Sequence, residues 1–420
     1  MDSNPPAVPR SWSRRIVLGM LGRFTRDALE LELPEGRVLR FGGESVEVQP
    51  ARLQIRGPGF FRRVVRDGEI GFGEGFMAGE WDSEDVTRLL RFFIRNIDQG
   101  PGRRHKGQHA WSPFYNLFAH AQRWSHWLRR NTRRNSQRNI AAHYDLSNAF
   151  YALWLDRSWT YSSAYFERPG QPLEDAQEAK YRRLAERLDL RPGQRILEIG
   201  CGWGGCAVYL ARHYGVHVTG LTISREQYDF ASRRVAAAGL GEQVDIRFCD
   251  YREMEGEFDA IVSIEMLEAV GHEFLEAYFR QCQRLLKRDG LLGLQVILSP
   301  DSRYEMGRKS ADWIKKHIFP GGQLPSVAAI NNAINRTGEL TLHGLESFGH
   351  HYARTLRIWR ERFNEQLDHV TALGFDTAFV RKWNFYLCYC EAAFATGHIN
   401  VAQIVYAFPN RETDAYLNDE

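Results

Sequence analysis

The feature that most constrains this chain is a regular alternation of strand-like and helix-like segments that begins near Leu188. Short apolar runs typical of buried strands alternate with longer segments of helical periodicity. The expected strands are 194–200, 216–223, 244–250, 258–264 and 290–298, and the expected helices are 206–214, 225–239 and 274–286. Such alternation predicts an α/β fold with a parallel sheet and helices on both faces. In open sheets of this kind, ligands bind at the carboxyl ends of the strands.

A glycine-rich loop follows the first of these strands and opens the first helix. It runs Glu-Ile-Gly-Cys-Gly-Trp-Gly-Gly over residues 198–205. The pattern GxGxGG differs from the GxGxxG that is typical of dinucleotide sites. A carboxylate two residues before the first glycine suits the sulfonium and amino groups of S-adenosylmethionine. The residues expected to bind this cofactor are Glu198, Gly200, Gly202, Trp203 and Gly204.

The ends of the next two strands are candidates for the nucleoside part of the cofactor. Asp250 closes the third strand, where methyltransferases of this fold commonly place an acid that faces the adenine amino group. A turn or capping role is the alternative for this residue. The second strand ends Gly220-Leu221-Thr222, so it lacks the acid that usually holds the ribose.

The first 100 residues predict a small α+β domain without an evident catalytic cluster. The expected strands are 37–43 and 46–55, and the expected helices are 60–66 and 84–96. Ser83 is the expected N-cap of the second helix. We therefore divide the chain into a small domain (1–100), a linker (101–138) and a methyltransferase domain (139–410).

Residues 99–144 contain nine Lys or Arg and no Asp or Glu. Aromatic residues are interleaved with them, among them Trp111, Phe114, Tyr115, Phe118, Trp124 and Trp127. One interpretation is a basic linker or a helix that covers the next domain. The other is a surface for anionic lipid, with aromatic rings at headgroup level and cations on phosphate. No nucleic-acid motif accompanies the segment, so we expect no nucleic-acid partner.

We expect a cytoplasmic protein that is peripheral to the inner face of the membrane. No apolar run approaches the ~18 residues that span a bilayer, and no signal peptide is evident. The six cysteines form neither a CxxC pair nor a zinc-like spacing with histidine, so we expect reduced thiols and no metal.

Nine ordered segments carry a resemblance to a known family. They are HYDLSNAFY (143–151), TYSSAYF (160–166), LEIGCGWGG (197–205), VTGLTISREQ (218–227), DYRE (250–253), MLEAVGHE (266–273), IFPGGQLPS (318–326), HYARTLRIW (351–359) and YLCYCEAAF (386–394). With them, the sequence resembles the cyclopropane-fatty-acyl-phospholipid synthases and the mycolic-acid cyclopropane synthases. The likeness is close over 139–408 and looser over 30–98, where GEGFMAGEW (73–81) resembles the family's lipid-binding-like domain.

The resemblance implies a Rossmann-like class I methyltransferase sheet with helical cap insertions, plus the small α+β domain. It implies further cofactor contacts from Tyr161, Ser162, Thr222, Gln227 and Tyr251. It also implies a bicarbonate bound beside the transferred methyl group. The ligands of that anion map to Ser163, Glu268, Gln295, Ile297 and Tyr352. Cys390 stands at the position traditionally called the family's active-site cysteine, although no step needs a thiolate and pocket lining is the alternative.

Two of these positions depart from the best-known bacterial pattern. Ser163 stands where a cysteine is common, and its contact would be made through the backbone N–H. Gln295 stands where a histidine is common, and a glutamine donates a hydrogen bond but does not titrate near neutral pH. With EAVG at 268–271, Gln295 resembles a longer, plant-like branch and relatives with methylene or branched products.

The chemistry implied by the resemblance begins with an alkene, which is a poor nucleophile. Methyl transfer leaves a positive charge on the acyl chain that aromatic faces can stabilise. The candidates for this are Tyr161, Tyr165, Trp313, Tyr352 and Tyr386. Loss of a proton from the new methyl group closes a cyclopropane, and loss from a neighbouring carbon gives a methylene or methyl-branched lipid, the latter with a redox partner.

We therefore expect an enzyme that acts on unsaturated phospholipid acyl chains at an anionic membrane surface, as a monomer or a homodimer. Cyclopropanation is the leading outcome, and methylation without ring closure is the first alternative. Methylation of a small soluble amine or phenol is the second, and a lipid-binding protein without catalysis is the third.

Overall fold

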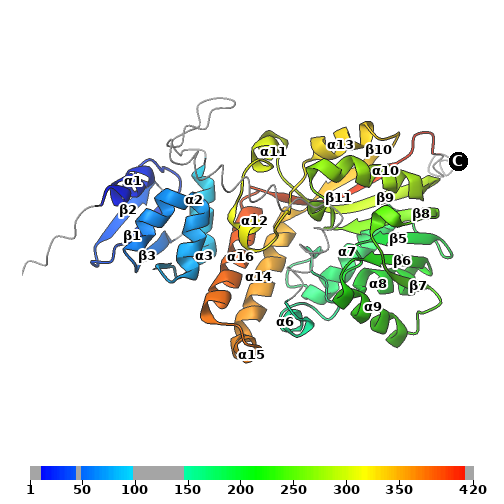
Figure 1. Cartoon of the computed structure of the whole chain (residues 1–420), viewed down its shortest axis with the longest axis horizontal. Helices are drawn as coiled ribbons and strands as arrows, with labels where there is room; N and C mark the ends of the chain where they lie inside the picture. The colour runs from blue at the N-terminus through cyan, green and yellow to red at the C-terminus, as the bar shows by residue number, and fades with distance from the viewer. Residues whose placement is uncertain (1–10, 44–48, 98–145, 412–420) are drawn as a thin grey trace, which may run out of the picture.

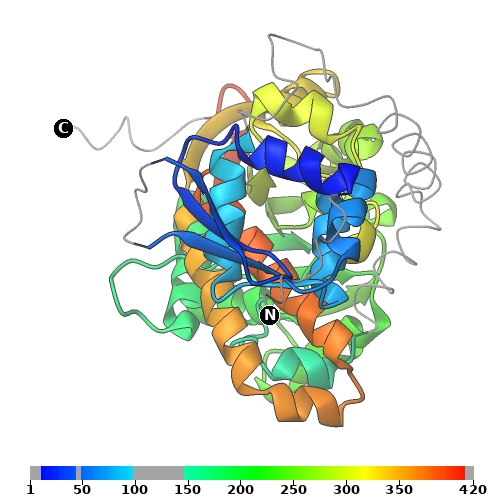
Figure 2. The same ribbon diagram turned by 90° about the vertical axis from the view of Figure 1, so that its left-hand side faces the viewer.

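The computed structural model describes residues 11–43, 49–97 and 146–411. A small domain lies at one end of the molecule and a larger α/β domain at the other, with α12, α14 and α16 between them (Figure 1). Figure 2 looks from the side of the small domain, with the orange helices behind it. The basic aromatic segment 99–144 lies outside the described residues and stays a prediction from the sequence.

The small domain contains a four-stranded sheet of order β2-β1-β3-β4 with helices on one side. Burial alternates along β1 and β3, so Leu29, Leu31 and Leu53 face the helices. The strands are β1 (Ala28–Glu32), β2 (Val38–Gly42), β3 (Ala51–Ile55) and β4 (Trp81–Asp82), and the helices are α1 (Trp12–Leu21), α2 (Gly59–Met77) and α3 (Val86–Arg95).

Three expectations for this domain need correction. The helix expected over 60–66 continues to Met77, with a break at Gly68, whose φ is 57°. The strand expected over 46–55 begins at Ala51, and residues 44–48 lie outside the described part. The N-cap of α3 is Asp85 and not Ser83, because the Asp85 carboxylate accepts the Arg88 N–H at 2.8 Å.

The larger domain is built on a seven-stranded sheet of order β10-β11-β9-β8-β5-β6-β7. The strands are β5 (Arg195–Ile199), β6 (His217–Thr222), β7 (Val244–Phe248), β8 (Phe258–Ile264), β9 (Leu286–Leu298), β10 (Thr341–Ser347) and β11 (Asn400–Ala407). Five of them, β5 to β9, are parallel, and β9 is buried almost continuously from Leu291 to Val296. The α/β fold class, with a methyltransferase-like sheet, is confirmed.

The sheet is not parallel throughout, because β11 runs antiparallel to both of its neighbours. Helix α16 ends at Ala395 at the carboxyl edge of the sheet, and β11 begins only a few residues later beside Leu298. A strand that starts at this edge must run back across the sheet. Strand β10 is mostly exposed, so its sequence lacks a buried pattern.

The helices of the larger domain fall into two groups. One group covers the sheet: α8 (Gly205–Tyr214), α9 (Arg225–Ala237) and α10 (Leu275–Leu285) connect parallel strands, α7 (Leu173–Arg187) precedes β5, and α13 (Val327–Asn335) packs on α10 and the sheet. The others lie at or beyond the carboxyl edge: α6 (Asn148–Ala152), α11 (Asp301–Gly307), α12 (Trp313–His317), α14 (Gly349–Glu365), α15 (Leu367–Ala372) and α16 (Thr377–Ala395). The expected cap insertions correspond to this second group.

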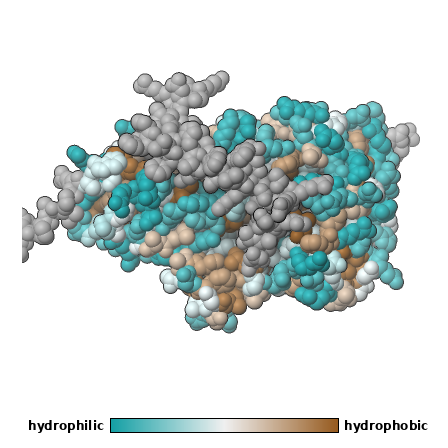
Figure 3. Space-filling view, in the orientation of Figure 1, coloured by the Kyte–Doolittle hydropathy of each residue, from teal (hydrophilic) through white to brown (hydrophobic). Residues whose placement is uncertain are grey.

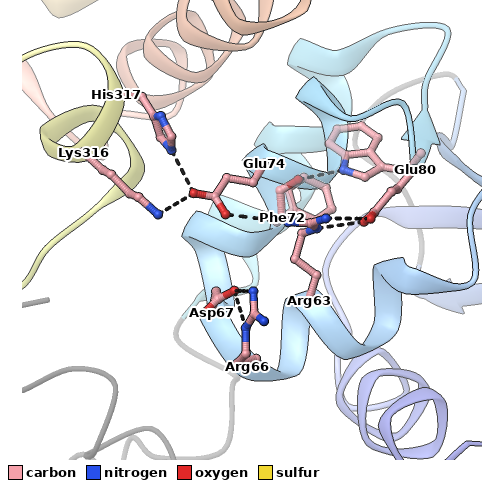
Figure 4. Close-up of polar contacts among 9 residues, drawn as sticks. Arg63, Arg66, Asp67, Phe72, Glu74, Glu80, Lys316 and His317 are labelled. Atoms are coloured by element: carbon pink, nitrogen blue, oxygen red, sulfur yellow. Dashed lines mark hydrogen bonds and ion pairs between the residues drawn. The ribbon is translucent and has the colours of Figure 1, made fainter. Parts of the chain in front are cut away.

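The small domain packs on the cap through α2. A Cβ added to Gly73 would lie 2.5 Å from the ring of Trp313, so the two elements approach as closely as glycine allows. Glu74 accepts hydrogen bonds from Lys316 and His317 of α12, while Arg63 forms a two-pronged ion pair with Glu80 (Figure 4). The two domains therefore share one packed interface.

The surface seen in Figure 3 is mostly hydrophilic, with hydrophobic residues gathered over the lower end of α14, α15 and α16. Among the described residues, no helix combines the length and apolar character needed to cross a membrane.

Candidate active site

The glycine-rich loop has the geometry that its sequence predicts. Gly200, Gly202 and Gly204 have φ values of 84°, 53° and 80°, a region that L-residues with side chains rarely adopt. A Cβ on Gly200 would lie 2.8 Å from the Met266 side chain, whereas a Cβ on Gly202 would meet only open space. The loop thus turns sharply between β5 and α8 and presents bare backbone to a ligand.

A cavity of about 430 Å³ opens at this loop, at the carboxyl edge of the sheet. It extends past Glu265 and Glu268 to the aromatic faces of α14 and α16, and then to α12. The expected site residues that line it are Tyr161, Ser162, Glu198, Gly200, Gly202, Trp203, Glu268, Ile297, Tyr352 and Cys390. Its size lies in the usual range of small-molecule sites.

A smaller cavity of about 90 Å³ adjoins the same loop and is lined by Thr222, Asp250 and Tyr251. Gly200 and Met266 line both cavities, so the two spaces meet there. The Asp250 carboxylate is held by the Arg252 guanidinium, with Nε at 2.8 Å from Oδ1.

Two of the expected cofactor residues line neither cavity. The Thr222 hydroxyl donates a hydrogen bond to the Gln227 Oε1 at 2.9 Å. Gln227 therefore orients Thr222, which does line the smaller cavity. Gly204 precedes α8, and its Cβ position lies 3.1 Å from Ala231. Both residues therefore act on the site through the residues that they contact, and not by lining a cavity.

Glu198 carries the clearest signal for a cationic ligand. The residue is 3% exposed and lines the larger cavity, and its Oε2 has no hydrogen-bond partner within the described part of the chain. Burial raises the pKa of Glu198 to about 7. A buried carboxylate oxygen that faces a cavity gains from a positively charged group placed beside it, so these residues fit S-adenosylmethionine.

Glu265 is the centre of a hydrogen-bond cluster that the sequence did not reveal. It follows the last residue of β8, and its φ is 50°. Its Oε1 accepts the Ser163 backbone N–H at 2.8 Å and the Gln295 amide at 2.9 Å. Its Oε2 accepts the Tyr352 hydroxyl at 2.7 Å. An acidic residue directly after a central strand was the available signal, because ligands bind at that edge.

The side chain of Gln295 is held in one orientation by its neighbour on the next strand. Gln403, which pairs with Gln295 across β9 and β11, donates to the Gln295 Oε1 at 3.3 Å. The Gln295 Nε2 is thereby left to donate to Glu265 and to the Ser163 carbonyl. Both Gln295 and Ser163 are almost completely buried, and neither lines the cavity.

The expected bicarbonate site is therefore different in this chain. Three of its five expected ligands, Ser163, Gln295 and Tyr352, donate to the Glu265 carboxylate, and Ile297 N donates to Glu268 at 2.5 Å. The chain's own carboxylates thus satisfy the donors that would hold the anion. The residues present do not fit a bound bicarbonate.

Glu268 differs from Glu265 in its surroundings. Ile297 N donates to its Oε1, and its Oε2 has no hydrogen-bond partner among the described residues. Burial, followed by the charge of Glu265, raises the pKa of Glu268 to about 8. Because three donors converge on Glu265, negative charge is more stable on Glu265 than on Glu268.

Lys180 is a second residue that the sequence analysis missed. It is fully buried on α7, and its Nζ donates to the Ser162 hydroxyl at 2.7 Å. Burial lowers the pKa of Lys180 to about 8, while the charges of Glu265, Asp156 and Glu198 oppose this shift. A lysine on the apolar face of an amphipathic helix was the signal in the sequence.

The far wall of the cavity is aromatic. The hydroxyls of Tyr161 and Tyr386 lie 2.8 Å apart, and the Tyr352 ring stacks on Phe394 at 4.4 Å. Of the expected aromatic candidates, Trp313 and Tyr165 do not line the cavity. Cys390 does, but burial raises the pKa of its thiol far above the usual value, which favours the neutral thiol over the reactive thiolate.

The sequence around this site is similar to that of known proteins. The family model for mycolic acid cyclopropane synthetase matches residues 131–404. The chain belongs to this family. A tuberculostearic acid methyltransferase, UfaA1 of Mycobacterium tuberculosis, is 41% identical over 349 residues, which cover 81% of this chain and 79% of the relative. The cyclopropane-fatty-acyl-phospholipid synthase of Escherichia coli K12 is 35% identical over 371 residues, 85% of this chain and 88% of the relative.

Solved structures of the mycolic acid cyclopropane synthetase family resemble the larger domain. The cyclopropane synthase MmaA2 from Mycobacterium tuberculosis is 33% identical, covers 64% of this chain and 98% of its own, and gives a TM-score of 0.60. The mycolic acid cyclopropane synthase CmaA1, complexed with SAH and CTAB, is 34% identical over 64% of this chain and 97% of its own, with a TM-score of 0.59. The chain is an S-adenosylmethionine-dependent methyltransferase that modifies acyl chains.

We expect the affinity for S-adenosylmethionine to rise several-fold between pH 6 and pH 8. Glu198, whose pKa is raised to about 7, must lose its proton to stabilise the cationic cofactor, so binding strengthens as pH increases through that value. Calorimetric titration at the two pH values measures the effect. Glu198→Gln should bind more weakly and lack most of this pH dependence; a wild-type affinity that is constant with pH would contradict the role of Glu198.

Proposed function

We propose that this enzyme transfers a one-carbon unit from S-adenosylmethionine to the double bond of an unsaturated phospholipid acyl chain and closes a cyclopropane. The observation that carries the proposal is a single cavity that joins three parts. These are the glycine loop, the carboxylates of Glu265 and Glu268, and the aromatic wall on α14 and α16. Such a cavity can place an apolar chain beside the cofactor and within reach of a carboxylate that can act as a base.

The residues at one end of the cavity would hold the cofactor. S-adenosylmethionine supplies an electrophilic methyl group when it is bound. Glu198 would face its cationic part, the loop at Gly200 and Gly202 would let the backbone approach, and Thr222 lines the smaller cavity. Tyr161 and Ser162 enclose the opposite side. The residues of the smaller cavity, with Asp250 and Tyr251, suit the adenosine part.

The aromatic wall would stabilise the acyl cation that methyl transfer leaves. An isolated alkene cannot be activated by deprotonation, so its alignment with the methyl group and the stabilisation of charge supply the catalysis. Tyr161, Tyr352 and Tyr386 line the cavity, and a cation over such a ring gains about 2 kcal/mol when it is desolvated. The cavity's apolar lining also keeps water away from the cation.

Methylation without ring closure is a second candidate, and one observation favours it. The relative at 41% identity is a tuberculostearic acid methyltransferase and not a cyclopropane synthase by name. The two outcomes differ in the fate of the cation after methyl transfer. Ring closure uses the electron pair of a methyl C–H bond, whereas a methylene product requires a hydride shift before the methyl group loses a proton, and proton loss from a chain carbon leaves a methylated alkene. A methyl-branched product also requires a reductant.

The substrate class is tested with purified protein, methyl-labelled S-adenosylmethionine and lipid vesicles. Vesicles of unsaturated phosphatidylglycerol and phosphatidylethanolamine should take up label, and matched vesicles of saturated lipid should not. Small soluble amines and phenols serve as competing acceptors. Label in a soluble acceptor, at a rate that vesicles leave unaltered, would replace the proposal with methylation of a small molecule.

We also propose that the enzyme reaches its substrate at an anionic membrane surface. The support is the basic and aromatic composition of residues 99–144. Basic residues near such a surface contribute about 1 kcal/mol each, so reversing four of them should weaken vesicle binding at least about tenfold. The substituted residues are Arg129, Arg130, Arg133 and Arg134.

The matched control reverses four exposed arginines of the larger domain. These are Arg212, Arg233, Arg280 and Arg288. Co-sedimentation with phosphatidylglycerol vesicles at low and moderate salt measures both variants. Equal binding by the two variants would show that segment 99–144 does not form the membrane contact.

A further inference from the structure

We infer that Glu265 is the general base that removes the proton after methyl transfer, in the position that the family resemblance assigns to bicarbonate. The inference rests on the proposed function and adds to it the identity of the base. It follows from three observations: the hydrogen-bond donors that converge on the Glu265 carboxylate, the position of this carboxylate at the cavity, and the backbone conformation of Glu265.

The first observation is the convergence of donors on this one carboxylate. The Ser163 N–H, the Gln295 amide and the Tyr352 hydroxyl lie at 2.8, 2.9 and 2.7 Å from its two oxygens. Three hydrogen bonds hold a carboxylate in its ionised form and in one position. Bicarbonate presents similar acceptor oxygens and the same single charge, so one group can stand in for the other.

The second observation is the order of these groups from the cavity outwards. Glu265 lines the cavity beside Gly200 and Met266 of the cofactor region, whereas Ser163 and Gln295 do not line it. The Glu265 side chain therefore lies between those two donors and the space for substrate. An anion that used the same donors would have to displace it.

The third observation is the backbone conformation. Glu265 has φ of 50°, in the left-handed region where glycine is the favoured residue. Residues held in this region cluster at functional sites, because the surrounding structure must maintain them against strain. The conformation turns the chain directly after β8 and directs the side chain to its three donors.

The proposed step is balanced without any further reactant. One carboxylate oxygen of Glu265 takes a proton from the methyl group that has just joined the acyl chain. The C–H bond breaks, and its electron pair forms the bond to the neighbouring cationic carbon, which closes the ring. Glu265 becomes a carboxylic acid and the acyl chain becomes neutral. The proton then returns to solvent when the product leaves.

The charged groups around Glu265 suit this role. Lys180 on α7 is the nearby cation, Glu268 follows on the same connection, and Tyr352 on α14 remains a neutral donor. Burial raises the pKa of Glu265, and Lys180, Gln295 and Tyr352 oppose that shift. A carboxylate whose pKa is raised is a stronger base than an ordinary carboxylate, which suits removal of a proton near neutral pH.

Two substitutions at this position test the inference. Glu265→Gln keeps the size of the side chain and an oxygen for Ser163 and Gln295, so the fold and cofactor affinity should be retained while kcat falls at least about 100-fold. Glu265→Gly removes the carboxylate and suits the positive φ, and it leaves Ser163 N, Gln295 and Tyr352 facing a space of carboxylate size. In bicarbonate-free buffer the Gly variant should be as inactive as the Gln variant.

The decisive measurement is the response of each protein to added bicarbonate. The Glu265→Gly variant should regain activity with bicarbonate, whereas the wild type and Glu265→Gln should not respond. Glu273→Gln, an exposed carboxylate on the same connection, is the matched control and should retain activity. Calorimetry with S-adenosylmethionine and thermal unfolding show that each variant is folded.

Each result bears on one of the two proposals. Near-normal turnover by Glu265→Gln, or a wild type that requires bicarbonate, overturns Glu265 as the base while the lipid product of the wild type stands. An absence of labelled lipid from the folded, cofactor-binding wild type overturns the proposed function itself and this inference with it.

Discussion

A valine at position 202 is expected to abolish S-adenosylmethionine binding and to leave the protein folded. The Cβ position of Gly202 meets no atom within 4 Å, and the residue lines the cavity, so an added side chain would occupy the cofactor's space and not collide with the chain. Because a valine is strained at a φ of 53°, the substitution should also lower the free energy of unfolding by about 1–2 kcal/mol. Calorimetric titration and urea unfolding separate the two effects.

Gly239→Val is the matched control for that variant. Gly239 also has a positive φ, 68°, and open space around its Cβ position, but it is exposed after α9 and lines neither described cavity. It should lose a similar amount of stability and bind the cofactor normally. Unchanged affinity in Gly202→Val would mean that the loop does not contact the cofactor at this position.

Replacement of Lys180 by methionine is expected to lower the free energy of unfolding by about 3 kcal/mol or more at pH 7. Methionine preserves the unbranched stem but removes a charge that is fully buried and faces Glu265 and Glu198. It also removes the donor to the Ser162 hydroxyl. Without the cation, these carboxylates must take up protons or remain buried without compensation.

Urea unfolding of the variant and of Lys382→Met gives the comparison. Lys382 is a half-buried lysine of α16 whose pKa is lowered by burial alone, so its loss should change stability by less than about 1 kcal/mol. Turnover by Lys180→Met should also fall, because loss of the Lys180 charge favours the protonated form of Glu265. A Lys180 variant as stable as the Lys382 variant would contradict the compensation of charge at the site.

Much of the sheet and the cofactor loop could be predicted because both depend on local patterns. The strand expected over 258–264 is β8 itself, and the expected glycines adopt positive φ values. Strand β10 could not be recognised in the same way, because an exposed edge strand carries no apolar alternation. The direction of β11 depends on where α16 ends in space, which no local pattern records.

The sequence predicted most of the residues at the site, but not which of them contact one another. Ser163, Gln295 and Tyr352 were expected around one anion, and the structure does bring them together. The group at their centre is Glu265, which lies beyond the end of a strand and has no motif of its own. Its identity depends on contacts between β8, β9, α14 and the segment after α6, which form only in the folded chain.

The central claim is tested most directly by the product formed in cells that make the protein and are fed methionine with a fully deuterated methyl group. Mass spectrometry and NMR of the phospholipid acyl chains then report what was added. The account predicts a cyclopropane that carries two of the three deuterium atoms, with the original double bond lost. An acyl chain that keeps the whole trideuteriomethyl group, or that contains an exomethylene group, would contradict ring closure, and unlabelled phospholipid would contradict the proposed substrate.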